Sequence, residues 1–361
     1  MRPPGALAPL ATPEPANFLR LEELSLERLR ALDGARTLAV CAVSALEVHG
    51  PHLPIGADFH QAVWMADETG RRFAAAHPEW TVLRHPPLPI GADELPIAGS
   101  IDSPPRVVYA AVTALGDSLA RAGIRWILIT NAHGGPRHAA ALEAACRRVT
   151  RRRGVAMFTP SVRALHPLVT GRAEARVEAF LGRKLGDDER HGLATGEHAG
   201  TWETSWYLAM HPEWVGAGWR ELGEDHPPRF APLLRAAGWL RRRGVRVRRR
   251  GARLGLPDTL EALSGSVGWL LNTRRGYGRP PGAPPVSYSG WPAVASPELG
   301  RAYAELSVAA SLADLEAVVA GRARADEIRS IASDPAIIQP NFWRWAALAA
   351  GLALLALRAL A

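Results

Sequence analysis

Short apolar runs alternate with longer segments of helical character between residues 37 and 159. The runs are five to seven residues long, and the segments between them fifteen to twenty. Apolar strands that alternate with helices of this length are typical of a parallel sheet covered by helices on both faces. We therefore expect an α/β fold with a doubly wound parallel sheet. The expected strands are residues 37–43, 80–84, 125–130 and 155–159, and the expected helices are residues 18–32, 58–77, 104–122 and 137–151.

The loops after the first and the third expected strand carry acids, histidines and an asparagine. Glu47, His49 and Asp58 follow the first strand, and Asn131 and His133 follow the third. Ligands of doubly wound sheets bind beyond the carboxyl ends of the strands. We therefore expect these two loops, which are remote in sequence, to meet at one rim of the sheet.

The first loop reads S-A-L-E-V-H-G-P-H-L-P-I-G-A-D-F-H over residues 44–60. In an extended segment Glu47 and His49 point the same way, whereas Val48 points to the opposite side. Two prolines and two glycines exclude a helix here, so the loop must turn and bring Asp58 back towards its start. Carboxylates and imidazoles suit Zn²⁺, Mn²⁺ or Fe²⁺, and we predict a metal site. The alternative is a loop whose polar side chains are only solvated or hydrogen-bonded.

The second loop, N-A-H-G-G-P-R over residues 131–137, has a glycine pair just before an expected helix. The backbone N–H groups of Gly134 and Gly135 are suited to bind an oxyanion or a substrate. Alone, this loop could equally be a turn capped by Asn131.

A third cluster lies in G-E-H-A-G-T-W-E-T-S over residues 196–205. It contains Glu197, His198 and Glu203 around the start of a helix. Each of them has an ordinary structural explanation, as a residue of the first helical turn or as a packed histidine. Three such clusters in one chain favour a functional site.

These three clusters together resemble the creatininase family, the creatinine amidohydrolases and their relatives. The matching pieces are L-E-V-H-G-P-H-L-P-I-G-A-D, N-A-H-G-G and E-H-A-G-T-W-E-T-S. A fourth piece, Y-S-G-W-P-A-V-A-S-P-E-L-G-R over residues 288–301, resembles the family's C-terminal turn and last helix. The resemblance covers residues 24–319, with poor matching over residues 219–287. It implies a three-layer α/β/α fold with a mainly parallel sheet.

The resemblance also implies two divalent metal ions per chain, as Zn, Mn or Fe. Glu47 and His133 are similar to the ligands of one metal and His49 to a ligand of the second, with Asp58 as the bridge. Creatinine-cleaving members carry a further carboxylate where this chain has Gly135. Relatives with the H-G-G form place a glutamate of the third piece at the second metal, which implies that role for Glu203.

The implied reaction is hydrolysis of an amide C–N bond other than a peptide bond, in a cyclic amide, a formamide or a similar small molecule. A water molecule activated by the two metals would attack the carbonyl carbon. His198 would carry the proton to the leaving nitrogen, with Glu197 beside it, and Gly134 and Gly135 would bind the oxyanion. His52 and Asn131 are expected to orient the ligands, as is Glu197.

Creatinine itself is not the expected substrate. Gly134 and Gly135 replace a Tyr-Glu pair of the creatinine enzymes, and the tryptophan that precedes the third-piece histidine in those enzymes is absent, since residues 194–196 read A-T-G. Two alternatives stay open: a mycofactocin-type peptidase, and a membrane-tethered binding protein that keeps the fold without turnover.

The composition sets the domain organisation and the compartment. With 361 residues, 47% apolar and 22% charged, the chain is globular rather than disordered. Its two cysteines, Cys41 and Cys146, cannot build a disulfide framework, and we expect a reducing, cytoplasmic location. We expect a flexible arm over residues 1–17 and one catalytic domain over residues 18–330. The resemblance suggests a homo-oligomer.

Two segments stand apart from the catalytic pattern. Residues 235–253 contain nine arginines and no acid, whereas the net charge of the whole chain is +8. We expect an exposed basic insertion, because the interleaved aromatic residues of a single-strand binder and a nucleic-acid fold signature are absent. Electrostatic binding of nucleic acid or of anionic lipid through this segment stays open as an alternative. We expect an apolar helix over residues 340–361, whose uncharged run of thirteen residues is shorter than the roughly 20 that cross a bilayer. A membrane anchor, an oligomerisation helix and a helix packed on the body all stay open for it.

Overall fold

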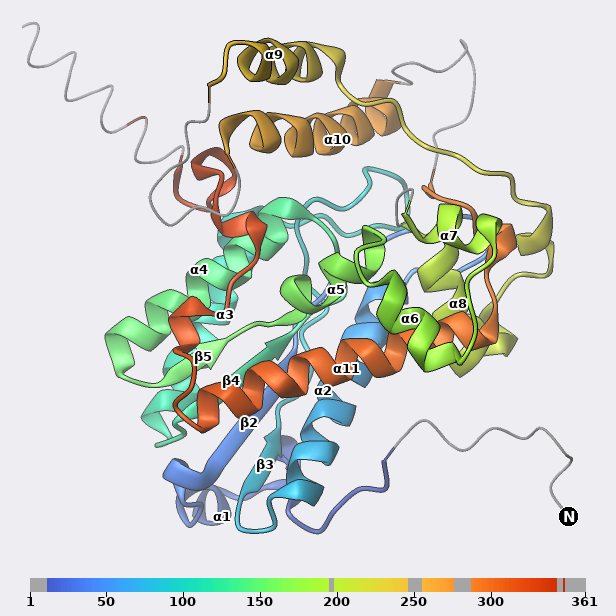
Figure 1. Ribbon diagram of the computed structural model, residues 1–361. Coiled ribbons are helices and arrows are strands. Elements are labelled where there is room, and N and C mark those ends of the chain that lie inside the picture. Colours follow the sequence, from blue (N-terminus) through green and yellow to red (C-terminus); the bar gives the residue numbers. More distant parts are fainter. Residues whose placement is uncertain (1–11, 195–197, 246–254, 276–286, 343–346, 348–361) are drawn as a thin grey trace, which may run out of the picture.

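Five parallel strands form one sheet in the computed structural model, which describes residues 12–194, 198–245, 255–275, 287–342 and 347. The strand order is β1-β3-β2-β4-β5, and these strands all pair in parallel (Figure 1). This confirms the expected α/β fold with its mainly parallel sheet. The strands are β1 (Phe18–Arg20), β2 (Thr37–Ala42), β3 (Thr81–Arg84), β4 (Trp126–Thr130) and β5 (Ala156–Phe158).

Helices cover both faces of the sheet, which makes three layers. Leu38 and Val40 of β2 pack with α2 and α11 on one face, whereas Ala39 and Cys41 pack with α3 and α4 on the other. This alternation follows from the period of two along a strand, and it explains why the strand is apolar throughout. The four helices are α2 (Ala57–Ala76), α3 (Pro105–Arg121), α4 (Pro136–Arg153) and α11 (Pro297–Val319).

The expected helix over residues 18–32 is wrong. Its first three residues are instead the edge strand β1, which pairs with β3, and Phe18 is buried beside Val82. Only α1 (Leu26–Arg30) is α-helical, capped by Ser25, whose Oγ accepts from Arg28 N at 3.2 Å. The helical spacing of apolar residues was overridden because the sheet edge offers strand pairing and a buried place for Phe18.

The sheet has its topological switch point between β2 and β4. The chain leaves β2 to form β3 on one side, then crosses to β4 on the other side of β2. Val43 N donates to Thr130 O at 2.9 Å, so the loops after β2 and β4 leave the sheet next to each other. A doubly wound sheet binds its ligands in the crevice at this point.

Six further α-helices of the described chain lie outside the sheet. Trp202, Trp206 and Tyr207 of α8 are buried in one cluster with Leu299 and Tyr303 of α11. In Figure 1, α9 and α10 lie together at the top of the view, apart from the sheet. The helices are α5 (Ser161–Val169), α6 (Glu174–Leu181), α7 (Asp187–Ala194), α8 (Thr201–Met210), α9 (Ala231–Arg242) and α10 (Leu256–Arg275).

Three expected segments are only partly covered by the described residues. Residues 1–11 of the arm lie outside them, whereas Thr12 donates to Glu68 of α2 from its backbone N at 2.9 Å and its Oγ1 at 2.6 Å. Of the arginine-rich insertion, residues 246–254 lie outside. Residues 343–346 and 348–361 of the expected C-terminal helix also lie outside the described residues. Across the described ranges, no helix combines the length and the apolar character needed to cross a membrane.

Candidate metal centre

The loop after β2 folds back on itself as expected. Glu47 N donates to Ile55 O at 2.9 Å, which closes the loop just before α2 begins. Asp58 lies in the first turn of α2 and therefore returns to the side of Glu47. The carboxylate of Glu47 is held in place by the backbone N of Leu95, which donates to its Oε1 at 2.6 Å.

The loop after β4 is tied to the first loop through Asn131. The side chain of Asn131 donates to His133 O at 2.8 Å and accepts from His133 N at 3.0 Å. Ser44 Oγ, from the first loop, donates to the same amide oxygen at 3.0 Å. Asn131 thus fixes the backbone of His133 rather than its imidazole.

Backbone carbonyls fix the tautomers of two buried histidines. His49 Nδ1 lies 2.8 Å from Glu47 O, and His133 Nε2 lies 3.0 Å from Ala92 O. A carbonyl oxygen can only accept, so these nitrogens carry the protons. In the neutral rings, the lone pairs are therefore on His49 Nε2 and His133 Nδ1.

Both lone pairs point at carboxylates, in two groups that share Asp58. His133 Nδ1 lies 3.0 Å from Glu47 Oε2 and 3.0 Å from Asp58 Oδ2. His49 Nε2 lies 3.4 Å from Asp58 Oδ1 and 3.4 Å from Glu203 Oε2. Within each group the candidate ligand atoms are less than 4.8 Å apart. Each oxygen of Asp58 thus serves one group.

The cluster is buried, and its charges are strongly coupled. No member is more than 5% exposed. Burial lowers the pKa of His49, but Asp58 and Glu203 outweigh it and raise that pKa to about 10. In the same way Glu47 and Asp58 hold the pKa of His133 well above its ordinary value against the effect of burial. Burial raises the pKa of Glu203 to about 7.

This donor set fits divalent cations. Among the described residues, Glu47 Oε2 and His49 Nε2 are buried without a hydrogen-bond partner. Such atoms are costly unless a proton or a cation satisfies them. Three carboxylates and two imidazoles are the ligand types that Zn²⁺, Mn²⁺ and Fe²⁺ accept.

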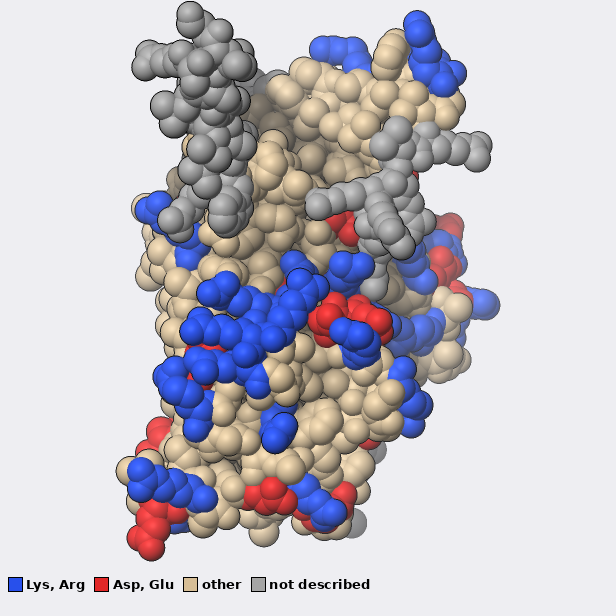
Figure 2. All heavy atoms as spheres, turned by 90° about the vertical axis from the view of Figure 1, so that its left-hand side faces the viewer, with Lys and Arg blue, Asp and Glu red and all other residues tan. Residues whose placement is uncertain are grey.

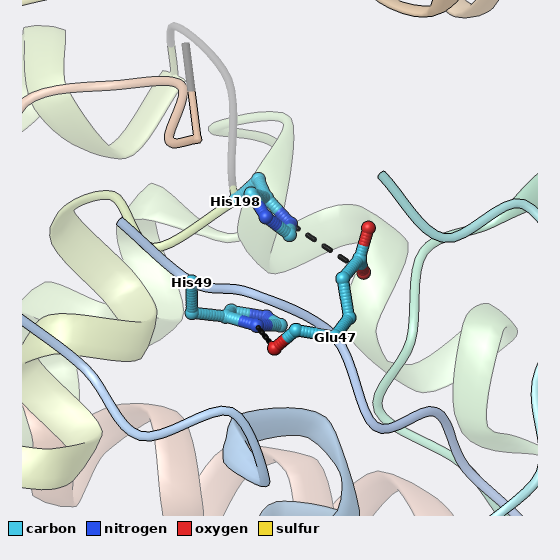
Figure 3. A group of neighbouring side chains, drawn as sticks. All are labelled: Glu47, His49 and His198. Atoms are coloured by element: carbon cyan, nitrogen blue, oxygen red, sulfur yellow. Dashed lines mark hydrogen bonds and ion pairs between the residues drawn. The ribbon is translucent and has the colours of Figure 1, made fainter. Parts of the chain in front are cut away.

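His198 lies against this cluster, as Figure 3 shows with Glu47 and His49. Its ring centroid is 4.2 Å from that of His49, and its Nδ1 is 3.8 Å from Glu47 Oε2. Its Nε2 donates to Val48 O at 2.9 Å, so Nδ1 carries the lone pair in the neutral ring. Burial, together with His49, lowers the pKa of His198 to about 4. The ring is therefore a neutral acceptor.

The other candidate residues lie around the cluster. Gly134 is exposed and Gly135 is buried at the N-terminal end of α4. His52 Nε2 lies 2.8 Å from Thr204 Oγ1, so it contacts the helix that carries Glu203 and not a candidate ligand. Glu197 lies outside the described residues.

Gly135 occupies a position where no side chain fits. A Cβ there would lie 2.4 Å from His133 Nε2 and 2.6 Å from Ala92 O. The carboxylate that creatinine enzymes carry at this position therefore has no room in this chain. Glu203 reaches the cluster from α8 instead.

Two residues near the centre were missed from the sequence. The ring of Trp269 on α10 lies 5.4 Å from the ring of His198, and nothing in its local sequence indicates this contact. Glu94 is 3% exposed, and burial raises its pKa to about 8. Glu94 lies in the loop after β3, so the rule about carboxyl ends of strands could have found it.

Fold and site together define a parallel α/β protein with a buried centre of carboxylates and histidines at the carboxyl edge of its sheet. The sequence profile of the creatininase family, described as creatinine amidohydrolase, matches residues 22–315. The chain belongs to the creatininase family.

A solved structure agrees with this fold. The chain is similar to a protein of Bacteroides fragilis NCTC 9343 assigned as a creatinine amidohydrolase, with 19% identity and a TM-score of 0.53 over 83% of this chain and 96% of that one. It is also similar to a structure of creatinine amidohydrolase (creatininase), with 18% identity and a TM-score of 0.49 over 83% and 96%. A search of curated proteins gives no match.

Proposed function

We propose that this protein is a metal-dependent hydrolase that cleaves the C–N bond of a small amide, such as a cyclic amide or a formamide. The observation that carries the proposal is the convergence of two imidazole lone pairs and three buried carboxylates on two groups that share Asp58. Glu47, Asp58 and His133 would hold one cation, and His49, Asp58 and Glu203 the other. We expect Zn²⁺, Mn²⁺ or Fe²⁺.

The residues of this chain would prepare the reaction around these cations. When bound, two such cations acidify water and polarise a carbonyl oxygen. His198 is neutral and presents Nδ1 towards Glu47, so it can accept a proton there and pass it to the leaving nitrogen. The backbone N–H groups of Gly134 and Gly135 are the proposed donors to the oxyanion. The ring of Trp269 contacts the ring of His198, with 5.4 Å between the ring centroids.

His198→Gln is expected to lower kcat by roughly 10²–10⁴-fold, because a general acid–base contributes about that much. Its metal content should stay at the wild-type value, since the two ligand triads, Glu47-Asp58-His133 and His49-Asp58-Glu203, remain intact. Elemental analysis and kinetics on the same preparation measure both. The matched control is His191→Gln, which changes a histidine that contacts Glu224 at the surface. A kcat within twofold of the wild type would reject the role of His198.

Metal affinity is expected to rise with pH between 6 and 8. In the metal-free protein the pKa of His49 is raised to about 10 and that of Glu203 to about 7, so both lose protons when they bind a cation. Each displaced proton should increase the affinity about tenfold per pH unit below the pKa of its group, so Glu203 adds to the slope below about pH 7 and His49 over the whole range. Calorimetric titration with Zn²⁺ in buffers of different ionisation enthalpy counts these protons. An affinity that is constant over this range would contradict the arrangement.

The proposed function is tested by metal analysis together with a substrate screen. Protein purified without chelator is assayed for Zn, Mn and Fe, and then on cyclic amides, formamides and short peptides. Metal binding with hydrolysis of a small amide, lost in Glu47→Gln, supports the proposal. Hydrolysis of peptides alone would favour the peptidase alternative, and metal without any turnover would favour a binding protein. The expected homo-oligomer stays a prediction.

A further inference from the structure

A basic groove lies on the opposite end of α4 from the candidate metal centre. It has a volume of about 690 Å³ and runs between α4 and residues 336–342, with Tyr109 of α3 at its wall. Gly135 precedes α4, and Arg147 lies twelve residues further along it, roughly 18 Å at the rise of an α-helix. The groove is therefore separate from the cluster around Asp58.

Four guanidinium groups line this groove, and none of its described lining residues is acidic. They belong to Arg147, Arg148, Arg151 and Arg152, which are spaced so that they share one side of α4. Figure 2 shows a field of Lys and Arg side chains on this face of the molecule, the side of α3 and α4 in Figure 1.

The neighbouring acids balance only part of this charge: Arg147 and Arg152 each have an acidic partner, and Asp326 lies close enough for Arg151 to lower its pKa. Glu143 is buried below the groove, where its carboxylate accepts from Ser330 N at 2.8 Å and from Ser333 Oγ, and it lies 3.8 Å from Arg147. Asp117 accepts from Arg153 at 2.7 Å and lies 3.7 Å from Arg152. Within the described part of the chain, Arg148 and Arg151 form no ion pair.

The chain that follows the groove adds no negative side chain. Residues 336–361 contain two arginines and neither aspartate nor glutamate. Burial lowers the pKa of Arg147, Glu143 opposes this, and the nearby positive charges of Arg329 and Arg151 lower it further. An anion would relieve this repulsion.

We propose that this groove is a binding site for a phosphate-bearing molecule of about nucleotide size. Guanidinium groups bind phosphate oxygens in pairs, and four of them suit a ligand with more than one phosphate. Gln339 and Asn341 add amide groups, and Tyr109 and Phe342 add aromatic rings for an attached base or apolar moiety. The same phosphate chemistry could come from a soluble molecule or from a lipid headgroup.

Calorimetry of the full chain with pyrophosphate, with ADP and with phosphatidylglycerol vesicles tests the site and separates these sources. Arg148→Ala/Arg151→Ala should weaken binding about a hundredfold, since each guanidinium contributes about tenfold. These two arginines are exposed and form no described ion pair, so the variant should fold. The matched control is Arg28→Ala/Arg30→Ala, which removes two exposed arginines from α1 and should leave the affinity unchanged.

Binding of pyrophosphate or ADP that the groove variant loses supports a soluble phosphate ligand. Binding confined to the vesicles and lost in the same variant supports the site with a lipid headgroup as the source. No binding at about 50 mM salt, where screening is weak, overturns the proposal. If the control pair weakens binding equally, the proposal is also overturned, because binding would then depend only on the net charge of the protein.

Discussion

Asp58→Asn is expected to remove both cations and to abolish hydrolysis. Asp58 alone contributes to both triads, one oxygen to each, and asparagine keeps its shape but replaces one oxygen by an N–H donor. The two proposed cations would supply several kcal/mol of transition-state stabilisation, so kcat/KM should fall on the order of 10³-fold or more. Elemental analysis and kinetics measure the two losses together.

Two further variants test whether the loss of both cations is specific to Asp58. Glu203→Gln should lose one cation and keep the other, because Glu203 belongs to one triad only. Asp67→Asn lies on the same helix but pairs with Arg71 and Arg84 outside the centre, and it should keep both cations. An Asp58→Asn protein that still holds two metals per chain would refute the shared-carboxylate arrangement.

Gly135→Ala is expected to destabilise the protein and to disrupt the centre. The added methyl group would meet His133 Nε2 and the backbone oxygen of Ala92, whose hydrogen bond to that nitrogen fixes the tautomer of His133. Overpacking of this kind costs about 1–3 kcal/mol. Thermal unfolding and metal titration should show a lower Tm and a weaker affinity.

The neighbouring glycine provides the control for this variant. A Cβ on Gly134 would have no atom within 4 Å, so Gly134→Ala should leave Tm and metal content close to those of the wild type. If both alanine variants behave alike, the close approach at Gly135 does not constrain the site. This contrast also separates steric exclusion at Gly135 from a general need for glycine in the loop.

The layered fold was predictable because its signals are local. A fully apolar run such as residues 37–43 can only be a strand buried on both faces when helices flank it. The edge strand β1 was not predictable, since its three residues become a strand only by pairing with β3. Both cysteines are free and buried, in agreement with the prediction that they build no disulfide framework.

The part of the candidate site that lies within sequence motifs was predictable. Glu47, His49 and Asp58 lie close in sequence, and the sheet rule brought His133 to the same rim. The prediction that Glu203 is a metal ligand came from the family resemblance. The structure places its carboxylate 3.4 Å from His49 Nε2. The contact of Trp269 with His198 depends on how α10 packs, which no local pattern encodes.

The distribution of the five candidate ligands along the chain has a consequence for folding. They come from the loop after β2, the start of α2, the loop after β4 and the start of α8, so the donor set exists only after widely separated segments have docked. Closing such long loops is entropically costly and slow. We therefore expect cations to load late, on a nearly native chain, and to stabilise the whole domain against unfolding rather than one segment of it.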